Sequence, residues 1–319
     1  MRVQRPASFW VSHIVGLIVG AACVVVLVLV LGVVLYWDSN GGRLAPPGSS
    51  AQHMPAPARY TSQQLIFDDP FSGTSLDTTK WTTSLGAQGT VWNDHGRLPT
   101  PYSAPNVPGA GNGDTAMFGP SQVSVDNGLT LTAQRNTNQY AGTYPWISGV
   151  VTTDGKFSLP SGGWYVQVKA KMPDMTAGMW PAIWFMPDTP TSPVPEIDLF
   201  EGGFLGPGPQ NGVMHTDYGG GASEYSGYRD TLYATGSDLT AGYHVYGIEY
   251  IPHVSVKYFF DGKLMFEQSE LNSGGVVAGT YELLLELQVA AQQTSPWHTV
   301  TTGTTPSASM DVAEVQVYS

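Results

Sequence analysis

Three acidic residues, Glu196, Asp198 and Glu201, lie within the six-residue stretch Glu-Ile-Asp-Leu-Phe-Glu. Hydrolysis of a glycosidic bond needs two such carboxyl groups, one to exchange a proton and one to attack the sugar or activate water. Like charges this close repel each other, and a site that needs one acid and one base can exploit that repulsion. A solvated acidic face on an edge strand is the alternative. Only 12% of the chain is charged and aromatic residues crowd the region, so we favour a catalytic cluster.

The same stretch has the apolar and β-branched character of a buried strand, and Gly202-Gly203 closes it. Side chains alternate along a strand, so Glu196 and Asp198 share one face while Glu201 points to the other. A β-bulge at Leu199-Phe200 would return Glu201 to the shared face. We therefore expect this bulge.

Aromatic residues near the acidic stretch are candidates for sugar binding. Trp180 and Trp184 are an even number of residues apart, so on a strand they share a face where flat rings can stack on sugars. Filling the core is the alternative for either ring. Further candidates for contact with a substrate are His215, Tyr218 and Trp92, with Trp146 and Trp297 as weaker ones.

Composition limits the class of protein. The net charge of −12 argues against a nucleic-acid partner, which requires cationic patches, and suits a neutral polysaccharide better than an anionic one. The only cysteine is Cys23, which excludes an intrachain disulfide and a cysteine metal cluster. With 38 glycines and 24 prolines, the chain favours short strands joined by turns.

Strand patterns recur from Gln64 onward, and no helix longer than a turn or two is expected there. The clearest patterns are a hairpin at Val123–Ala133, strands at Gly163–Met172, Glu282–Val289 and Ala313–Tyr318, and a hairpin at Val254–Phe266 around Asp261-Gly262. Strands at this spacing predict an all-β fold, a two-sheet antiparallel sandwich.

The N-terminal part differs in character. Ile14 to Trp37 is free of charge and, at about 1.5 Å per residue, would span about 36 Å as a helix, enough to cross a bilayer. We expect residues 1–37 to be a cytoplasmic stub and transmembrane signal anchor, residues 38–63 a Pro/Gly/Ser-rich flexible linker, and residues 64–319 an extracytoplasmic domain. Secretion after cleavage of a signal peptide is the alternative.

The motif Glu196-Ile-Asp198-Leu-Phe-Glu201 resembles the Glu-x-Asp-x-x-Glu signature of glycoside hydrolase family 16 in its bulged, laminarinase-like form. Further stretches agree in the family's order, and the likeness covers about residues 64–319. They are Phe67–Gly73 with Leu76-Asp77 and Trp81, Gly178–Trp184, His215, Tyr243–Tyr246, Asp261–Lys263 and Met310–Val312.

The resemblance implies a jelly roll with a concave sugar-binding face, Glu196 as nucleophile and Glu201 as acid/base. It also implies that Asp198 hydrogen-bonds Glu196 and that His215 lies near Glu201. Met310-Asp311 matches a region where some members bind calcium, but the spacing here gives no reason to expect a metal or any other cofactor.

The resemblance implies an endo-acting retaining β-glycan hydrolase acting on β-1,3- or mixed-linkage glucan or a β-galactan. Two alternatives stay open: an envelope polysaccharide transglycosylase, and a non-catalytic carbohydrate-binding wall protein. Departures from the family pattern at Val91–His95 and Glu286–Ala291 leave the exact substrate open.

Overall fold

The computed structural model describes residues 54–83, 90–91, 98–99, 116–136, 146–188, 196–220, 229–269, 276–290 and 307–319. Within them the regular elements are β-strands and short 3-10 helices. The strands are β1 Leu65–Asp69, β2 Thr90–Val91, β3 Leu98–Pro99, β4 Ala116–Phe118, β5 Val123–Val125, β6 Leu129–Arg135, β7 Trp146–Ser148, β8 Val150–Thr152, β9 Trp164–Lys171, β10 Met179–Pro187, β11 Glu196–Glu201, β12 Val213–Gly220, β13 Arg229–Ala234, β14 His244–Ile251, β15 Ser255–Phe260, β16 Lys263–Ser269, β17 Tyr281–Val289 and β18 Ser307–Tyr318. The 3-10 helices are η1 Ser62–Gln64, η2 Pro120–Gln122, η4 Met175–Ala177 and η5 Gln210–Gly212.

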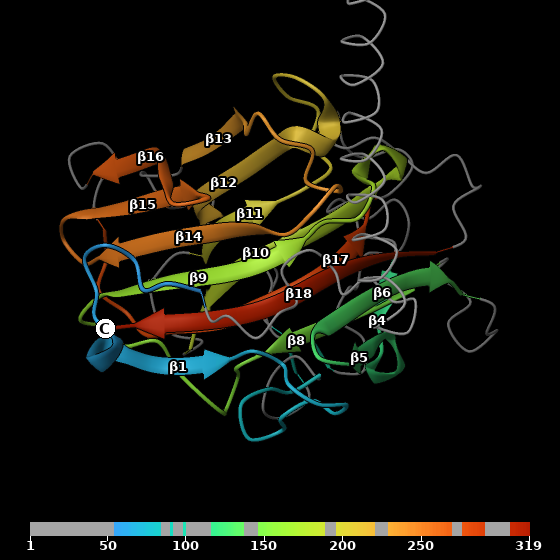
Figure 1. Ribbon diagram of the computed structural model, residues 1–319, viewed down its shortest axis with the longest axis horizontal. Helices are drawn as coiled ribbons and strands as arrows, with labels where there is room; N and C mark the ends of the chain where they lie inside the picture. Colours follow the sequence, from blue (N-terminus) through green and yellow to red (C-terminus); the bar gives the residue numbers. More distant parts are fainter. Residues whose placement is uncertain are drawn as a thin grey trace, which may run out of the picture. The chain divides into compact units, whose positions relative to one another are not determined.

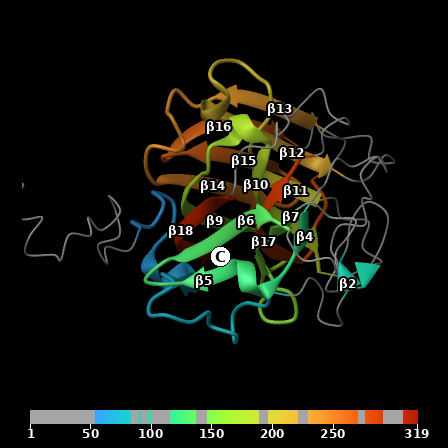
Figure 2. The same cartoon turned by 90° about the vertical axis from the view of Figure 1, so that its right-hand side faces the viewer.

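Two large sheets make up the fold (Figure 1). The ten-stranded sheet has the order β16-β15-β14-β9-β18-β6-β7-β4, with β1 paired to β18 and β5 to β6. The six-stranded sheet has the order β13-β12-β11-β10-β17-β8. Figure 2 shows β14, β9 and β18 on one side and β10, β17 and β11 on the other. The predicted all-β antiparallel sandwich is confirmed in these ranges, with β4 and β7 as a parallel pair.

The core fills the space between the two sheets, and strand alternation explains its composition. In β9, Val166, Val168 and Ala170 face inward and are fully buried, as predicted. In β17, Leu283 and Leu285 do the same from the six-stranded sheet. Each such leucine or valine contributes about 1.5–3 kcal/mol by leaving water. The alternate positions of the six-stranded sheet point away from the core, and we call this side its outer face.

The predicted turns join the strands where the sequence places them. Asn127 connects β5 to β6 with φ 52°, and Asp261 and Gly262 connect β15 to β16 with φ 47° and 75°. Positive φ at both central residues is the geometry of the tight hairpin turn that Asp-Gly favours. These turns fix the register of the paired strands.

The predicted linker is wrong in its last part, because residues 54 onward pack on the ten-stranded sheet. The Met54 amide donates to Glu314 Oε2 at 2.7 Å, and the Pro55 carbonyl accepts from Gln167 Nε2 at 3.1 Å. Both partners are buried polar side chains of the sheet. A buried carboxylate or amide without a partner is costly, so these contacts hold the segment in place.

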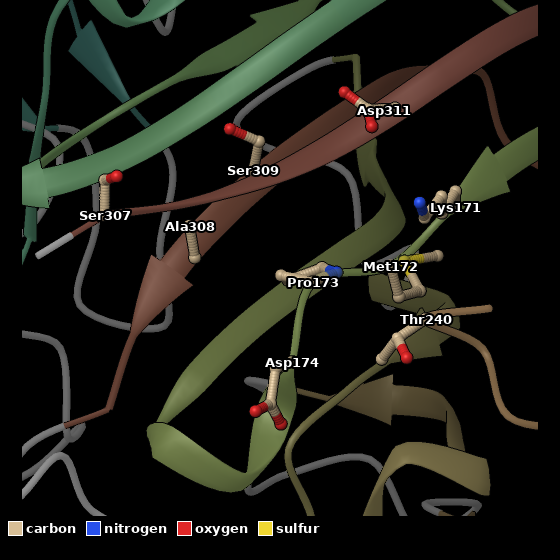
Figure 3. Close-up of a pocket in the computed structure, with 9 residues that line it drawn as sticks. All are labelled: Lys171, Met172, Pro173, Asp174, Thr240, Ser307, Ala308, Ser309 and Asp311. Carbon is tan, nitrogen blue, oxygen red and sulfur yellow. The ribbon is translucent and has the colours of Figure 1, made fainter. Parts of the chain in front are cut away.

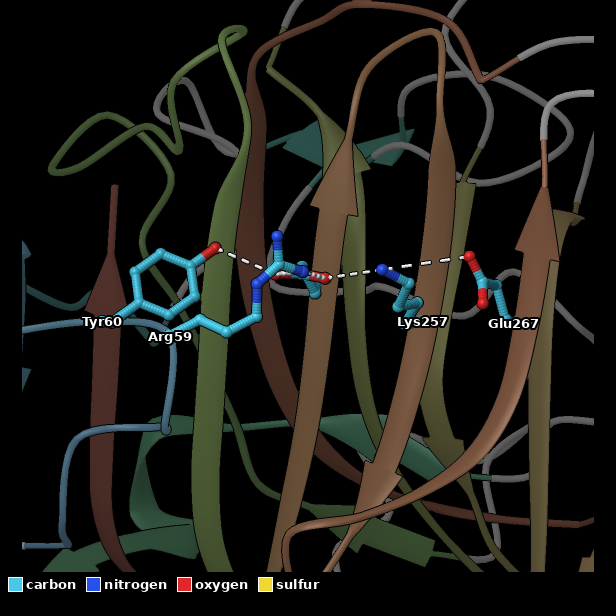
Figure 4. A network of polar contacts seen from close by, with 5 residues as sticks. Arg59, Tyr60, Lys257 and Glu267 are labelled. Atoms are coloured by element: carbon cyan, nitrogen blue, oxygen red, sulfur yellow. Dashed lines mark hydrogen bonds and ion pairs between the residues drawn. The ribbon is translucent and has the colours of Figure 1, made fainter.

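A charged network continues the same attachment (Figure 4). Buried Glu249 accepts two hydrogen bonds from Arg59 Nη1, at 2.9 and 3.0 Å, and one from Lys257 Nζ at 3.1 Å. The Tyr60 hydroxyl donates to the same carboxylate at 3.4 Å, and burial followed by the charge of Glu249 raises the pKa of Tyr60 to about 12. The ordered domain therefore includes residues 54–63, ten residues that the sequence assigned to the linker.

The helices in the described ranges contain three residues each, and none of them could cross a bilayer. The predicted membrane segment, residues 14–37, lies outside these ranges.

Candidate active site

The predicted β-bulge is present in β11 and places the acidic residues. Opposite β10, Asp198 pairs with Trp184 and Glu201 pairs with Ala182, so between these pairs two residues of β11 lie opposite a single residue of β10, Ile183. The same extra residue appears opposite β12, where Asp198 pairs with Asp217 and Glu201 with His215. The extra residue brings Glu201 back to the outer face, which Asp198 also occupies.

The apolar residues of the bulge anchor it. Leu199 and Phe200 are both fully buried in the core between the sheets. Gly202 follows directly, and a Cβ there would lie 2.9 Å from the Pro181 side chain, too close for any other residue without a shift. Gly203 has φ 87°, a backbone conformation that favours glycine. The packing of the bulge and the glycines after it thus fix the direction of Glu201.

Two neighbours hold the carboxylate of Glu201. The indole Nε1 of Trp180 donates to Oε1 at 2.9 Å, and Nδ1 of His215 lies 2.6 Å from Oε2. The His215 ring stacks on Phe204, with ring centroids 4.2 Å apart. The Glu201 side chain is 13% exposed, so it is shielded but still reachable from solvent. A carboxyl group held at both oxygens, with access to the outer face, is suited to exchange protons with a bound substrate.

Asp198 lies between the two glutamates along the strand and is buried. Burial raises the pKa of the Asp198 carboxyl well above its usual range, and the negative charges of Glu201, Glu196, Asp217 and Glu286 raise it further. The carboxyl of Asp198 is therefore harder to ionise than that of an exposed aspartate. The half-buried Glu196 begins the strand, where it pairs with Gly220.

Trp184 occupies the outer face with Trp180, as alternation predicts. It is half-buried and packs against a small apolar cluster separate from the main core. The cluster consists of Phe118, Val150, Met186 and Leu284. This packing orients the indole beside Asp198, its partner across the strands.

Two predicted aromatic contacts are wrong. Tyr218 is fully buried in the core, and its hydroxyl accepts a hydrogen bond from the Val277 amide at 3.1 Å. It lies an odd number of residues from His215, so the two side chains point to opposite faces of β12. Trp146 is also buried, in β7 rather than a loop, with the Arg135 guanidinium 4.2 Å from its ring centroid. Trp92 and Trp297 lie outside the described residues.

Two further acidic residues, Asp217 and Glu286, lie near this cluster. Neither was among the predicted site residues. Asp217 pairs directly with Asp198 across the strands, and the charge of Glu286 in β17 also acts on Asp198. The sequence held a signal for Asp217, because it lies two residues after His215 and alternation places both on one face. Glu286 belongs to a stretch already noted for its departure from the family pattern.

A separate pocket of about 340 Å³ lies elsewhere, at the end of β9 and the start of β18 (Figure 3). Its lining residues are Lys171, Met172, Pro173, Asp174, Thr240, Ser307, Ala308, Ser309 and Asp311. None of them belongs to the acidic cluster. Burial raises the pKa of Asp311, while the hydroxyl of Thr130, which donates to it at 2.9 Å, lowers it. This pocket is therefore separate from the three carboxyl groups of β11.

Comparison with known proteins agrees with this geometry. The model of glycosyl hydrolases family 16 matches residues 112–307. Glucan endo-1,3-beta-glucosidase A1 of Niallia circulans is 28% identical over 227 residues, which cover 67% of this chain and 30% of the relative. Endo-1,3-1,4-beta-glycanase EglC of Rhizobium meliloti is 31% identical over 157 residues, which cover 47% of this chain and 30% of the relative.

The fold has solved counterparts. The crystal structure of endo-beta-1,3-glucanase from Pyrococcus furiosus superposes with a TM-score of 0.61 at 25% identity, and the match covers 80% of this chain and 94% of that one. The chain spans 30% of the length of each curated relative named above. The family model covers more than half of the chain and includes the carboxylate motif, so the chain belongs to glycosyl hydrolases family 16.

Proposed function

We propose that this protein is an endo-acting β-glucan hydrolase that cleaves β-1,3- or mixed-linkage glucan with retention of configuration. The observation that carries the proposal is the position of Glu201, held by Trp180 and His215 on the face that the bulge gives it. Glu201 acts as the acid that protonates the leaving oxygen, and Glu196 attacks the anomeric carbon. Glu201 then removes a proton from the water that releases the sugar.

Asp198 reduces the negative charge between Glu196 and Glu201. Because its carboxyl is harder to ionise, we propose that it holds a proton, and the cluster then carries less negative charge next to Glu196 than three ionised carboxyls would give. A nucleophile must be ionised to attack, and a neutral neighbour able to donate a hydrogen bond favours that state. In this scheme Asp198 prepares Glu196 for the first step without touching the scissile bond.

The charge of the outer face favours an uncharged glycan. Glu201, Asp198, Asp217 and Glu286 lie close enough for their charges to interact. The strands β8, β10, β11, β12 and β17 contain no lysine or arginine, and β13 contains one arginine, Arg229, at its start. A negative potential of this kind repels sulfated or carboxylated chains and accepts neutral ones. Two of the curated relatives, named as a glucan endo-1,3-beta-glucosidase and an endo-1,3-1,4-beta-glycanase, support a glucan as the substrate.

We also propose that Trp184 forms a stacking platform for one sugar ring. Its indole lies beside Asp198 in the neighbouring strand and is oriented by the apolar cluster behind it. A flat, rigid ring that binds one face of a sugar adds affinity with little loss of conformational freedom.

The location of the protein is a further proposal. We infer that residues 14–37 anchor the chain in a membrane and that the catalytic domain is extracytoplasmic, because these 24 residues carry no charge and follow two arginines. Accessibility of the domain to protease in intact cells, before and after removal of residues 1–37, tests this point. Degradation only after cell lysis would reject it.

Hydrolysis assays on a panel of β-glucans, galactans and wall polysaccharides test the activity, with Glu196→Gln and Glu201→Gln alongside wild type. Glu267→Gln is the control, because Glu267 is a glutamate of β16 in the other sheet. We expect both site variants to lose about 10²–10⁴-fold in turnover and the control to retain it. Products longer than the starting chains would indicate transglycosylation. Tight binding of a glycan without any product would contradict the proposal.

A further inference from the structure

Phe204 is a buried aromatic residue that the proposed reaction does not yet use. It lies three residues after Glu201, directly beyond Gly202-Gly203, and is 4% exposed. In the part of the chain that the structure describes, neither the core between the sheets nor the small apolar cluster behind Trp184 includes it. Filling of the sandwich core therefore does not account for its position.

The ring of Phe204 contacts both side chains that hold Glu201. It stacks on His215, with ring centroids 4.2 Å apart and planes inclined by 19°. It also packs edge to face with Trp180, at a centroid distance of 6.5 Å and an angle of 89°. These are the residues whose nitrogens lie 2.6 Å and 2.9 Å from the two carboxylate oxygens of Glu201. One aromatic ring thus joins the two groups that hold the proposed acid.

The backbone on both sides of this ring is fixed. Gly203 has φ 87°, and its carbonyl accepts a hydrogen bond from Gln210 Nε2 at 2.6 Å. A Cβ on Gly206 would lie 2.9 Å from the side chain of Val213, so the loop runs close against the start of β12. Because β12 also carries His215, the loop and the strand hold the two stacked rings together.

The direction of a histidine or tryptophan ring needs support from its neighbours. The last side-chain torsion of both residue types has broad preferences, so neither ring is held in one plane by its own rotamer. A hydrogen bond weakens steeply when its donor turns out of line. Aromatic pairs at the distances found here prefer offset-stacked or edge-to-face arrangements. A flat ring packed on His215 and against Trp180 can therefore fix both directions.

We propose that Phe204 is a positioning residue, whose ring keeps His215 and Trp180 aimed at the two oxygens of Glu201. This inference deepens the proposed function and rests on it, because it concerns the acid/base of that reaction. Phe204 acts only through these two side chains and does not contact the scissile bond. A leucine in its place would keep an apolar side chain but lose the flat face, and the carboxyl group of Glu201 would lose its fixed direction.

Nitrogen-15 NMR of the full-length protein, labelled at histidine, tests the contact without a substrate. The spectrum of His215→Gln identifies the signals of His215, one of seven histidines. We expect Phe204→Leu to move the Nδ1 signal of His215 toward that of a solvent-exposed histidine, since its hydrogen bond with Glu201 is weakened. Phe204→Tyr keeps the flat ring and should leave the signal close to that of wild type.

Steady-state kinetics on a soluble β-glucan test the consequence for catalysis. We expect Phe204→Leu to lower kcat by about 10–100-fold with little change in KM, since a misplacement of about 1 Å can cost 10²-fold. Phe204→Tyr should restore most of the turnover. Phe67→Leu is the matched control, because it removes a ring of similar burial, 7% exposed, from β1 of the other sheet. It should lower stability and leave kcat and the His215 signals unchanged.

The proposal is overturned if either the Nδ1 signal or kcat stays at its wild-type value in Phe204→Leu, or if Phe67→Leu loses as much turnover. Phe204→Met replaces the leucine variant, under the same criteria, if that variant does not fold. Absence of hydrolysis by wild type would reject the proposed function. The Nδ1 signal would then still decide whether Phe204 holds His215 toward Glu201.

Discussion

Trp180 Nε1 donates a hydrogen bond to Glu201 Oε1 at 2.9 Å, from the strand next to that of the carboxylate. The contact depends on the bulge in β11, since regular alternation over the three residues from Asp198 to Glu201 would turn Glu201 toward the core. A tryptophan expected to bind sugar thus also orients the proposed acid. The same indole can serve both purposes, because its edge donates the bond while its face stays apolar.

Replacing Trp180 with phenylalanine should lower turnover more than it raises KM. The variant keeps an aromatic ring but loses a hydrogen bond to a charged group, which is worth about 1.5–3 kcal/mol. At about 1.36 kcal/mol per factor of ten, we expect kcat to fall roughly 10–150-fold. Trp184→Phe is the control and should mainly raise KM. Steady-state kinetics on a soluble β-glucan measure both, and equal changes in the two variants would contradict this role of Trp180.

Asp198→Asn should stabilise the protein at neutral pH while it lowers activity. Because the folded-state pKa of Asp198 is raised, its contribution is fully present below the unfolded pKa and is lost as pH rises through the folded pKa. The variant should therefore melt higher than wild type at neutral and alkaline pH and match it in acid. Thermal unfolding followed across pH provides the measurement.

Asp174→Asn is a control for this pH series, because its effect on stability should change with pH in the opposite direction. Asp174 accepts hydrogen bonds from the hydroxyl and amide of Thr176, and these contacts lower its pKa. Its contribution is present above the unfolded pKa and is lost as pH falls, so this variant should be destabilised at neutral pH and converge with wild type in acid. The same pH trend in both variants would count against the assigned shifts.

Changing the length of the bulge tests how Glu201 is aimed. Deletion of Leu199 leaves plain alternation, which keeps Glu201 on the face of Asp198, so we expect reduced but measurable hydrolysis. The lost leucine should cost about 2–5 kcal/mol of stability. Insertion of one alanine after Leu199 lengthens the segment by one residue; if the strand keeps its single bulge, Glu201 turns toward the core and activity is abolished. Equal activity of the two variants would disprove the role of the bulge.

The start of the domain can be located by truncation. A fragment that begins at Met54 keeps the hydrogen bonds to Glu314, Gln167 and Glu249, whereas one that begins at Gln64 loses them. We expect the shorter fragment to be less stable by on the order of 3 kcal/mol, since buried polar groups lose their partners. Urea unfolding of both fragments measures the difference.

The guanidinium of Arg59 accounts for only part of the stability that the shorter fragment loses. Its side chain is 66% exposed, so Arg59→Gln in the longer fragment should cost about 1 kcal/mol or less. Equal stability of the two fragments would show that residues 54–63 are a linker after all.

Most features of the fold that could be predicted from the sequence follow from strand alternation. It gave the core faces of β9 and β17, the hairpin turns and the need for a bulge in β11. The same rule also places Tyr218 in the core and Asp217 on the outer face, so these two errors came from weighing aromatic character over position.

Other features could not be predicted from local patterns. The attachment of residues 54–63 depends on Glu249, Glu314 and Gln167, which are distant in the sequence and become neighbours only when the strands pair. A Pro-rich stretch has no periodicity to reveal such a partner. The burial of Trp146 likewise follows from the pairing of β7 with β6 and β4.

The central claim, that Glu196 is the nucleophile of a retaining hydrolase, is tested most directly by trapping the covalent intermediate. A 2-deoxy-2-fluoro β-glucoside with a good leaving group should inactivate the protein, and mass spectrometry of its peptides should find one glycosyl group on Glu196. Glu196→Gln should remain unlabelled, and the first product of normal hydrolysis should have the β configuration by proton NMR. Label on Glu201, or a first product of inverted configuration, would contradict the account.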